Sequence, residues 1–252
     1  MNFRIIPCLL LRNQGLVKTI KFKKEIYIGD PINAIRIFND KEVDELVFLD
    51  ILATREKRPP NLEYIKKLAG ECFMPFAYGG GITNIDQIAE LNAIGVEKII
   101  VNSIAFSDAN FVKRAVERFG SSTIVISIDV KKDFFGKYHV YTHGGTKKVS
   151  ISLKEILNKI NEWQVGEVIV NSIDKDGTMQ GYDEFLIKLV TDVLDMPVIA
   201  LGGAGVIKDF QSVIMNAGAS AVAAGSFFVF YGPHKAVLIN YPTNEQIKSI
   251  NQ

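Results

Sequence analysis

Eight short apolar runs, most of them rich in Val and Ile, recur along this chain and alternate with stretches of helical patterning. They cover residues 4–10, 45–50, 76–78, 97–102, 123–129, 167–172, 198–201 and 221–224. Such runs are typical of parallel strands buried on both faces. Strands that alternate with helices in this way predict an α/β fold, either a closed barrel or an open doubly wound sheet.

The stretches between the strands carry helix-start signals. Asp30 before Pro31, Asn61 and Ser152 are typical N-caps. Asp108 is predicted to cap a helix that ends near Arg118, and another helix is expected over residues 182–194. The alternation breaks in three places: a polar loop is predicted over residues 12–30, a β-hairpin over about 132–148, and an irregular tail with a short terminal helix over 227–252.

Glycines and small polar residues follow the strands in two similar arrangements. Gly80 precedes Asn102 by 22 positions, and Gly203 precedes Gly225 by the same 22 positions. This repetition between the two halves favours the closed barrel. We therefore predict a single (βα)8 TIM-barrel domain over residues 1–252, with a hairpin insertion after the fifth strand and functional residues at the C-terminal strand ends.

Composition narrows the function classes. The formal net charge of +1 gives no general attraction to nucleic acid or to an acidic membrane. Two cysteines and three scattered histidines predict neither a disulfide framework nor a metal site, and no cofactor is expected. The chain enters its first strand almost at once and contains no long apolar run, so we expect no leader and no membrane span, and a cytoplasmic location.

The strand ends predict two phosphate sites and a small phosphorylated substrate, because backbone N–H groups of glycine loops before helices attract anions. The alternative is that the glycines only make tight turns. Asp50 and Asp129 could act as acid/base groups or could simply cap helices. The candidate site residues are Asp50, Gly80, Gly81, Asn102, Ser103, Asp129, Asp174, Asp176, Gly177, Gly202, Gly203, Gly225 and Ser226.

Charged residues flank the opposite, N-terminal ends of four strands. They are Arg4, Glu45, Lys98 and Glu167. Two positive and two negative charges on different strands could meet on the barrel axis. The alternative is a purely structural ion-pair plug or solvated strand ends.

Several of these segments together resemble the cyclase subunit of imidazole glycerol phosphate synthase. The matching segments are residues 4–9, 44–51, 79–82, 127–129, 172–178, 181–183 and 202–205. The resemblance implies a TIM barrel with one phosphate site at Gly81, Asn102 and Ser103 and another at Gly177, Gly203, Gly225 and Ser226. It also implies a glutaminase partner on the N-terminal face, an ammonia gate formed by the four charges, and a mobile-loop lysine at Lys18 that closes over substrate.

One departure from the family pattern changes the expected chemistry. The family's ring closure uses two aspartates, and the resemblance matches Asp129 to one of them, whereas Leu10 stands at the other position. Loss of one acid/base group typically costs about 10²- to 10⁴-fold in rate. The change resembles a branch associated with surface-sugar genes, thought to work with a glutaminase and a sugar amidotransferase that forms an acetamidino group. The tail beyond residue 227 also departs from the family's plain terminal helix.

The alternatives are a working cyclase of histidine biosynthesis, in which Asp50 or Asp174 replaces the missing carboxylate, a sister isomerase of the same pathway, and a scaffold that only activates the glutaminase. The isomerase has no need of the four-charge gate. If the chain belongs to the branch associated with surface-sugar genes, we expect it to lack ring-closing activity because Leu10 cannot transfer a proton.

Overall fold

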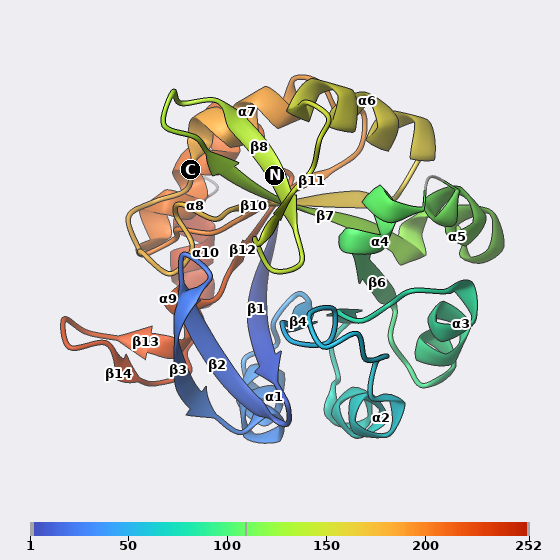
Figure 1. Cartoon of the computed structure of the whole chain (residues 1–252). Helices are drawn as coiled ribbons and strands as arrows, with labels where there is room; N and C mark the ends of the chain where they lie inside the picture. The colour runs from blue at the N-terminus through green and yellow to red at the C-terminus, as the bar shows by residue number, and fades with distance from the viewer. Residues whose placement is uncertain (1–2, 109, 251–252) are drawn as a thin grey trace.

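The computed structural model describes residues 3–108 and 110–250 of the chain, and within them eight parallel strands close into a barrel surrounded by helices (Figure 1). The strands are β1 (Arg4–Arg12), β4 (Leu46–Asp50), β5 (Phe76–Gly79), β6 (Lys98–Val101), β7 (Ile124–Lys132), β10 (Glu167–Ser172), β11 (Val198–Leu201) and β12 (Ala221–Ala224). Pairing of β7 with β10 and of β12 with β1 completes the ring. The (βα)8 barrel predicted from the sequence is confirmed.

Helices cover the outside of the ring. They are α1 (Pro31–Asp40), α2 (Leu62–Glu71), α3 (Ile85–Ala93), α4 (Ser103–Ser107), α5 (Phe111–Phe119), α6 (Leu153–Trp163), α7 (Glu184–Thr191), α8 (Ile207–Ala217), α9 (Ser226–Val229) and α10 (Asn244–Ile250). α6 shows why these segments pack. Ser152 and Glu155 form a capping box at its start, and Ile156, Ile160 and Trp163 on one stripe are buried against the strands.

The strands separate two apolar layers. The larger layer lies between strands and helices, and the smaller fills the barrel interior. Small and medium side chains, among them Ala77, Val125, Ile169, Ala221 and Ala223, dominate the inner layer. Both faces of each strand are therefore buried, which explains why the strands have continuous apolar sequences rather than alternating ones.

Two hairpins rise from the C-terminal side of the barrel. The first, β2 (Gly15–Ile20) and β3 (Lys23–Gly29), pairs antiparallel to the end of β1. The prediction of a polar loop at residues 12–30 is therefore wrong, because Leu16 and Val17 are buried and make this segment a strand. The second hairpin, β8 (Tyr138–Thr142) with β9 (Lys147–Lys148), extends β7 as predicted.

Some element boundaries differ from those expected. Asp108 does not cap α5, which starts after Asn110; the Asp108 carboxylate accepts from the Asn110 backbone N–H and pairs with Arg114. The helix expected over 182–194 is the shorter α7, capped by Asp183. The tail is less irregular than expected, since β13 (Phe230–Tyr231) and β14 (Ala236–Val237) form a hairpin before the expected terminal helix α10. A short 3-10 helix, η1 (Ser121–Thr123), precedes β7.

Both cysteines, Cys8 and Cys72, are free thiols. In the described part of the chain, no helix has the length and apolar character needed to cross a membrane.

Candidate functional site

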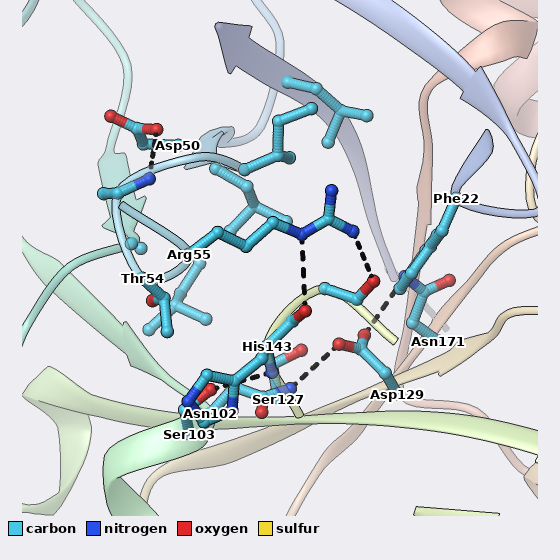
Figure 2. A pocket seen from close by; sticks show the side chains of 18 of the residues that line it. Phe22, Asp50, Thr54, Arg55, Asn102, Ser103, Ser127, Asp129, His143 and Asn171 are labelled. Atoms are coloured by element: carbon cyan, nitrogen blue, oxygen red, sulfur yellow. Dashed lines mark hydrogen bonds between the residues drawn. The ribbon is translucent and has the colours of Figure 1, made fainter. Parts of the chain in front are cut away.

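A cavity of about 660 Å³ opens at the C-terminal ends of the strands (Figure 2). Residues at the end of every barrel strand line it, from Leu10 on β1 to the loop after β12. Twelve of the thirteen candidate strand-end residues line the cavity: Asp50, Gly80, Gly81, Asn102, Ser103, Asp129, Asp176, Gly177, Gly202, Gly203, Gly225 and Ser226. Lys18 from β2 also lines it, whereas Asp174 does not.

Asp129 lies in β7 and lines the cavity. Its Oδ2 accepts from Asn102 Nδ2 at 2.9 Å, and its Oδ1 accepts from Asn171 Nδ2 at 3.4 Å. Burial raises the pKa of Asp129 to about 7, and the nearby charge of Asp176 acts in the same direction, while the two amide donors act against them. Asp129 therefore populates both protonation states near neutral pH and can accept and return a proton.

The two asparagines beside Asp129 carry buried oxygens that have no hydrogen-bond partner among the described residues. They are Asn102 Oδ1 and Asn171 Oδ1. Buried amide oxygens are almost always bonded. These two therefore leave acceptor capacity beside Asp129 for a donor that a ligand or water would supply.

Leu10 lies across the cavity from Asp129 and presents an apolar side chain there. It pairs with Leu49 on β4 and with Val17 on β2, and it lines the cavity together with Cys8, two residues earlier on β1. In the ring, β1 and β7 are separated by three strands on either side. The position across the mouth from Asp129 thus has no group that can transfer a proton.

The β2–β3 hairpin closes over one side of the cavity through Asp176. Thr19 Oγ1 donates to Asp176 Oδ2 at 2.8 Å, and the Phe22 N–H donates to the same oxygen at 3.3 Å. Gly177 has φ +70°, and a Cβ there would lie 2.1 Å from the Thr19 carbonyl oxygen. Only glycine permits the hairpin to approach this closely.

Lys18 points from the closed hairpin toward the loop after β12. Its Nζ lies 2.2 Å from the position that a Cβ on Gly225 would occupy, although Lys18 itself is almost fully buried. An ammonium group over a glycine-rich loop is suited to an anion. The hydroxyl of Ser226, buried at the start of α9, lies in the same loop.

Most other glycines of the site have a packing reason. A Cβ on Gly80 would lie 2.5 Å from the Asp50 carbonyl oxygen, and one on Gly203 would lie 2.2 Å from the Gly181 carbonyl oxygen. Ser103, beside the first glycine cluster, accepts from the His143 N–H at 3.1 Å. Tight loop packing therefore accounts for glycine at these two positions. At Gly225 the close neighbour is the Lys18 ammonium, and at Gly144 it is the Arg55 guanidinium.

Asp50 and Asp174 are already engaged by protein donors. Asp50 accepts from both terminal nitrogens of Arg58, at 2.9 and 3.1 Å, and from the backbone N–H groups of Leu52 and Ala53. Asp174 lies outside the cavity lining and accepts from the Lys132 N–H at 2.8 Å. Neither Asp50 nor Asp174 is therefore available to replace the carboxylate that the family pattern has at position 10.

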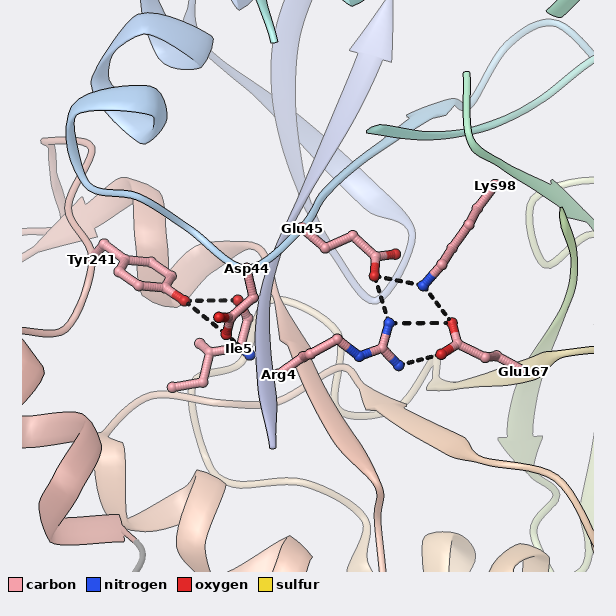
Figure 3. A network of polar contacts seen from close by, with 7 residues as sticks. All are labelled: Arg4, Ile5, Asp44, Glu45, Lys98, Glu167 and Tyr241. Carbon is pink, nitrogen blue, oxygen red and sulfur yellow. Dashed lines mark hydrogen bonds and ion pairs between the residues drawn. The ribbon is translucent and has the colours of Figure 1, made fainter. Parts of the chain in front are cut away.

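The four charges at the N-terminal end form one network (Figure 3). Glu45 accepts from Arg4 at 2.5 Å and from Lys98 at 2.7 Å, and Lys98 also bonds Glu167 at 2.9 Å. Arg4 pairs with Glu167 as well. Burial acts to lower the pKa of Arg4, but the two glutamates outweigh it and raise that pKa. The prediction that these charges meet is confirmed; their role as a gate stays a prediction.

Sequence reasoning missed several residues of the cavity. Asn171 and Thr19 are the clearest, and their only signal was a polar side chain within a β-branched run. Arg55 was also missed; it donates to the carbonyl oxygens of His143 and Gly144 and so links the loop after β4 to the β8–β9 turn. Across the described residues, no group of three or more His, Cys, Asp and Glu side chains could hold a metal ion.

Comparison with known proteins identifies the family. The family model described as "Histidine biosynthesis protein" matches residues 4–234. The chain belongs to this family. It is similar to "Putative imidazole glycerol phosphate synthase subunit hisF2" of Pseudomonas aeruginosa, with 49% identity over 239 residues, 95% of each chain.

Two further relatives are similar to this chain over almost its whole length. A putative subunit HisF of Leptospira interrogans is 48% identical over 248 residues, 98% of each chain. Imidazole glycerol phosphate synthase subunit HisF of Petrotoga mobilis is 40% identical over 234 residues, 92% of each chain. These similarities make the chain a HisF-like member of the histidine biosynthesis protein family.

Proposed function

We propose that this HisF-like chain receives ammonia from a glutaminase subunit at its N-terminal barrel face and delivers it for amidation of a bacterial surface sugar. In this role it works beside a separate sugar amidotransferase, which forms the acetamidino group. The observation that carries the proposal is the combination of an intact four-charge network at one end of the barrel with Leu10 at the other.

The barrel interior suits neutral ammonia. The inner layer consists of apolar side chains, including Ile6, Val47, Ile100 and Ile199. An unpaired ion is costly to bring into such surroundings, whereas a small neutral molecule is not. A ring of two cations and two anions at the entrance, with no net charge, closes this path until the ion pairs rearrange.

The cavity favours delivery of ammonia over ring closure. Ring closure in the family, as the resemblance implies, needs an aspartate on each side of the cavity. Here Asp129 has a pKa suited to proton transfer, but its counterpart is Leu10. Asp50 and Asp174, the possible replacements, are held by Arg58 and by the Lys132 backbone.

The second candidate is an active cyclase that makes imidazole glycerol phosphate and aminoimidazole carboxamide ribotide. Three observations favour it: the size of the cavity, the raised pKa of Asp129, and the ammonium of Lys18 over Gly225. A one-carboxylate mechanism would use Asp129 alone and would be slower by about 10²- to 10⁴-fold.

Steady-state assays separate the two candidates. Purified chain is incubated with ammonium and the family's phosphoribulosyl-formimino substrate, and ring closure is followed. We expect negligible turnover, and a rise of about 10²-fold in Leu10→Asp, because a second acid/base group is restored. Leu10→Asn is the control, since it is similar in size but does not transfer protons.

Robust turnover by the native chain would overturn the proposal in favour of the cyclase. The positive test adds a glutaminase subunit and a sugar amidotransferase. Glutamine should then drive amidation of the N-acetylated sugar, and Lys98→Met should reduce the glutamine-driven rate more than the rate with added ammonium.

A further inference from the structure

The start of β1 and the residues just before β4 are linked by hydrogen bonds next to the charged network; these hydrogen bonds are called the bracket below. Asp44 precedes Glu45, and Ile5 follows Arg4. The Ile5 N–H donates to Asp44 Oδ2 at 2.8 Å. The ladder between β1 and β4 begins only further on, where Cys8 pairs with Val47. At the level of the gate, the carboxylate of Asp44 therefore joins the two strands in place of a backbone ladder.

Tyr241, from the tail, completes this bracket (Figure 3). Its hydroxyl donates to the Ile5 carbonyl oxygen at 2.9 Å and lies 3.4 Å from Asp44 Oδ2. Burial raises the pKa of Tyr241 and the charge of Asp44 adds to this effect, so the hydroxyl keeps its proton. Both backbone polar groups of Ile5 are thus engaged by side chains, the N–H by Asp44 and the carbonyl oxygen by Tyr241.

The tail holds the Tyr241 ring firmly. The ring stacks on Phe228 with centroids 5.6 Å apart and planes 19° apart, and Phe228 in turn packs edge-on against Phe38 of α1. Backbone hydrogen bonds from the Leu238 N–H to the Val229 carbonyl oxygen and from the Asn240 N–H to the Phe228 carbonyl oxygen tie the segment before Tyr241 to α9. Packing against these buried rings therefore fixes the position of the Tyr241 hydroxyl.

We propose that Tyr241 is a positioning residue for the gate: together with Asp44 it fixes the ends of β1 and β4, so that Arg4 and Glu45 hold the register in which the entrance is closed. This inference rests on the proposed function, because it assumes that ammonia enters at the network. Glu45 is almost fully buried and accepts from Arg4 and Lys98 at once, so a small shift of either strand changes both contacts.

Tyr241→Phe tests the bracket, because it keeps the ring on Phe228 and removes only the hydroxyl. Tyr231→Phe is the matched control, since Tyr231 lies exposed on the same tail. In the full-length chain, hydrogen exchange of the Ile5 amide should be at least fivefold faster in Tyr241→Phe and unchanged in Tyr231→Phe. Both variants should melt within about 4 °C of the native chain.

The functional readout is the ratio of glutamine-driven to ammonium-driven product in the complex with the glutaminase and the amidotransferase. We expect this ratio to fall at least threefold in Tyr241→Phe, with the ammonium-driven rate unchanged. The ratio should fall less in Asp44→Asn, which retains an oxygen that can accept from the Ile5 N–H, than in Asp44→Ala. Unchanged exchange at Ile5, or an unchanged ratio, would overturn the role of Tyr241. A native complex that makes no product from glutamine would instead overturn the proposed function, and the exchange result would show whether the bracket itself exists.

Discussion

Glu45 is the residue whose loss should disturb the N-terminal network most. It is 3% exposed, and Arg4 and Lys98 both direct cationic groups at its Oε2. Glu45→Gln keeps the shape but leaves two cations facing Glu167 alone. Removing one partner of a buried pair costs about 3–5 kcal/mol. Because Arg4 is 32% and Lys98 19% exposed, water screens part of this loss, and we expect about 2–3 kcal/mol.

A double-mutant cycle with Lys98→Met gives the sharper test. Lys98→Met alone leaves two carboxylates facing Arg4 and should also destabilise the fold. The double variant retains one cation and one anion, Arg4 and Glu167, so its charge balance is restored. We therefore expect the double variant to be about 1–2 kcal/mol more stable than the sum of the two single effects predicts.

Urea unfolding followed by tryptophan fluorescence measures these free energies, because Trp163 is the single tryptophan and is buried. The control is the exposed ion pair between Lys188 and Asp192, 57% and 58% exposed, where removing one partner should change the free energy of unfolding by less than about 0.5 kcal/mol. Additive effects in the cycle, or a Glu45→Gln cost as small as the control, would refute the view that these charges act as one partly buried unit.

Other predictions concern the opposite end of the barrel. Burial raises the pKa of Asp129 to about 7 from 3.8, so folding favours the protonated acid; the free energy of unfolding should fall as pH rises between these values and level off above pH 7. Because the group lines an open cavity, we expect about 2 kcal/mol between pH 4 and pH 8, absent in Asp129→Asn; equal pH profiles for the two proteins would count against the assignment. Asn171→Ala should raise the pKa of Asp129 further, as measured by carbon NMR titration of the carboxyl, since an amide donor that lowers this pKa is lost. Gly177→Ala should destabilise the fold by about 2 kcal/mol or more and expose the β2–β3 hairpin to trypsin, because of its φ of +70° and the Thr19 carbonyl oxygen 2.1 Å away. Gly136→Ala, also at positive φ but with nothing within 4 Å, should cost only about 1 kcal/mol and leave the hairpin protected; similar proteolysis of both variants would contradict the packing argument.

The barrel and the location of its cavity could be predicted because they depend on local patterns. Buried parallel strands leave uninterrupted apolar runs in the sequence, and the chemistry follows each run directly, as with Asp129 after residues 123–128. The meeting of Arg4, Glu45, Lys98 and Glu167 also follows from strand register, since all four residues start or flank parallel strands at the same end.

Contacts between loops could not be predicted in this way. Lys18 reaches the cavity only because the hairpin folds onto Asp176, a partner 157 positions from Thr19. Asp50, Asp174 and Asp176 are alike in sequence, each following an apolar run, but they have different partners: Arg58, the Lys132 backbone, and Thr19. The loop that packs on each carboxylate decides which hydrogen-bond donors it meets. The local sequence around the carboxylate does not predict which loop that is.

The contact between Tyr241 and Ile5 also brings the end of the chain back to its beginning. Phe3 and Ile247 line one groove, so the described segments that include them lie close together. Joining these ends through a short linker and opening the chain at the exposed tip of the β7–β8 hairpin, between Phe134 and Phe135, would preserve every strand pairing of the barrel. Such a circular permutant would keep Arg4, Glu45, Lys98 and Glu167 on one continuous chain, and its new termini would lie at an exposed hairpin tip whose residues Phe134 and Phe135 do not line the cavity.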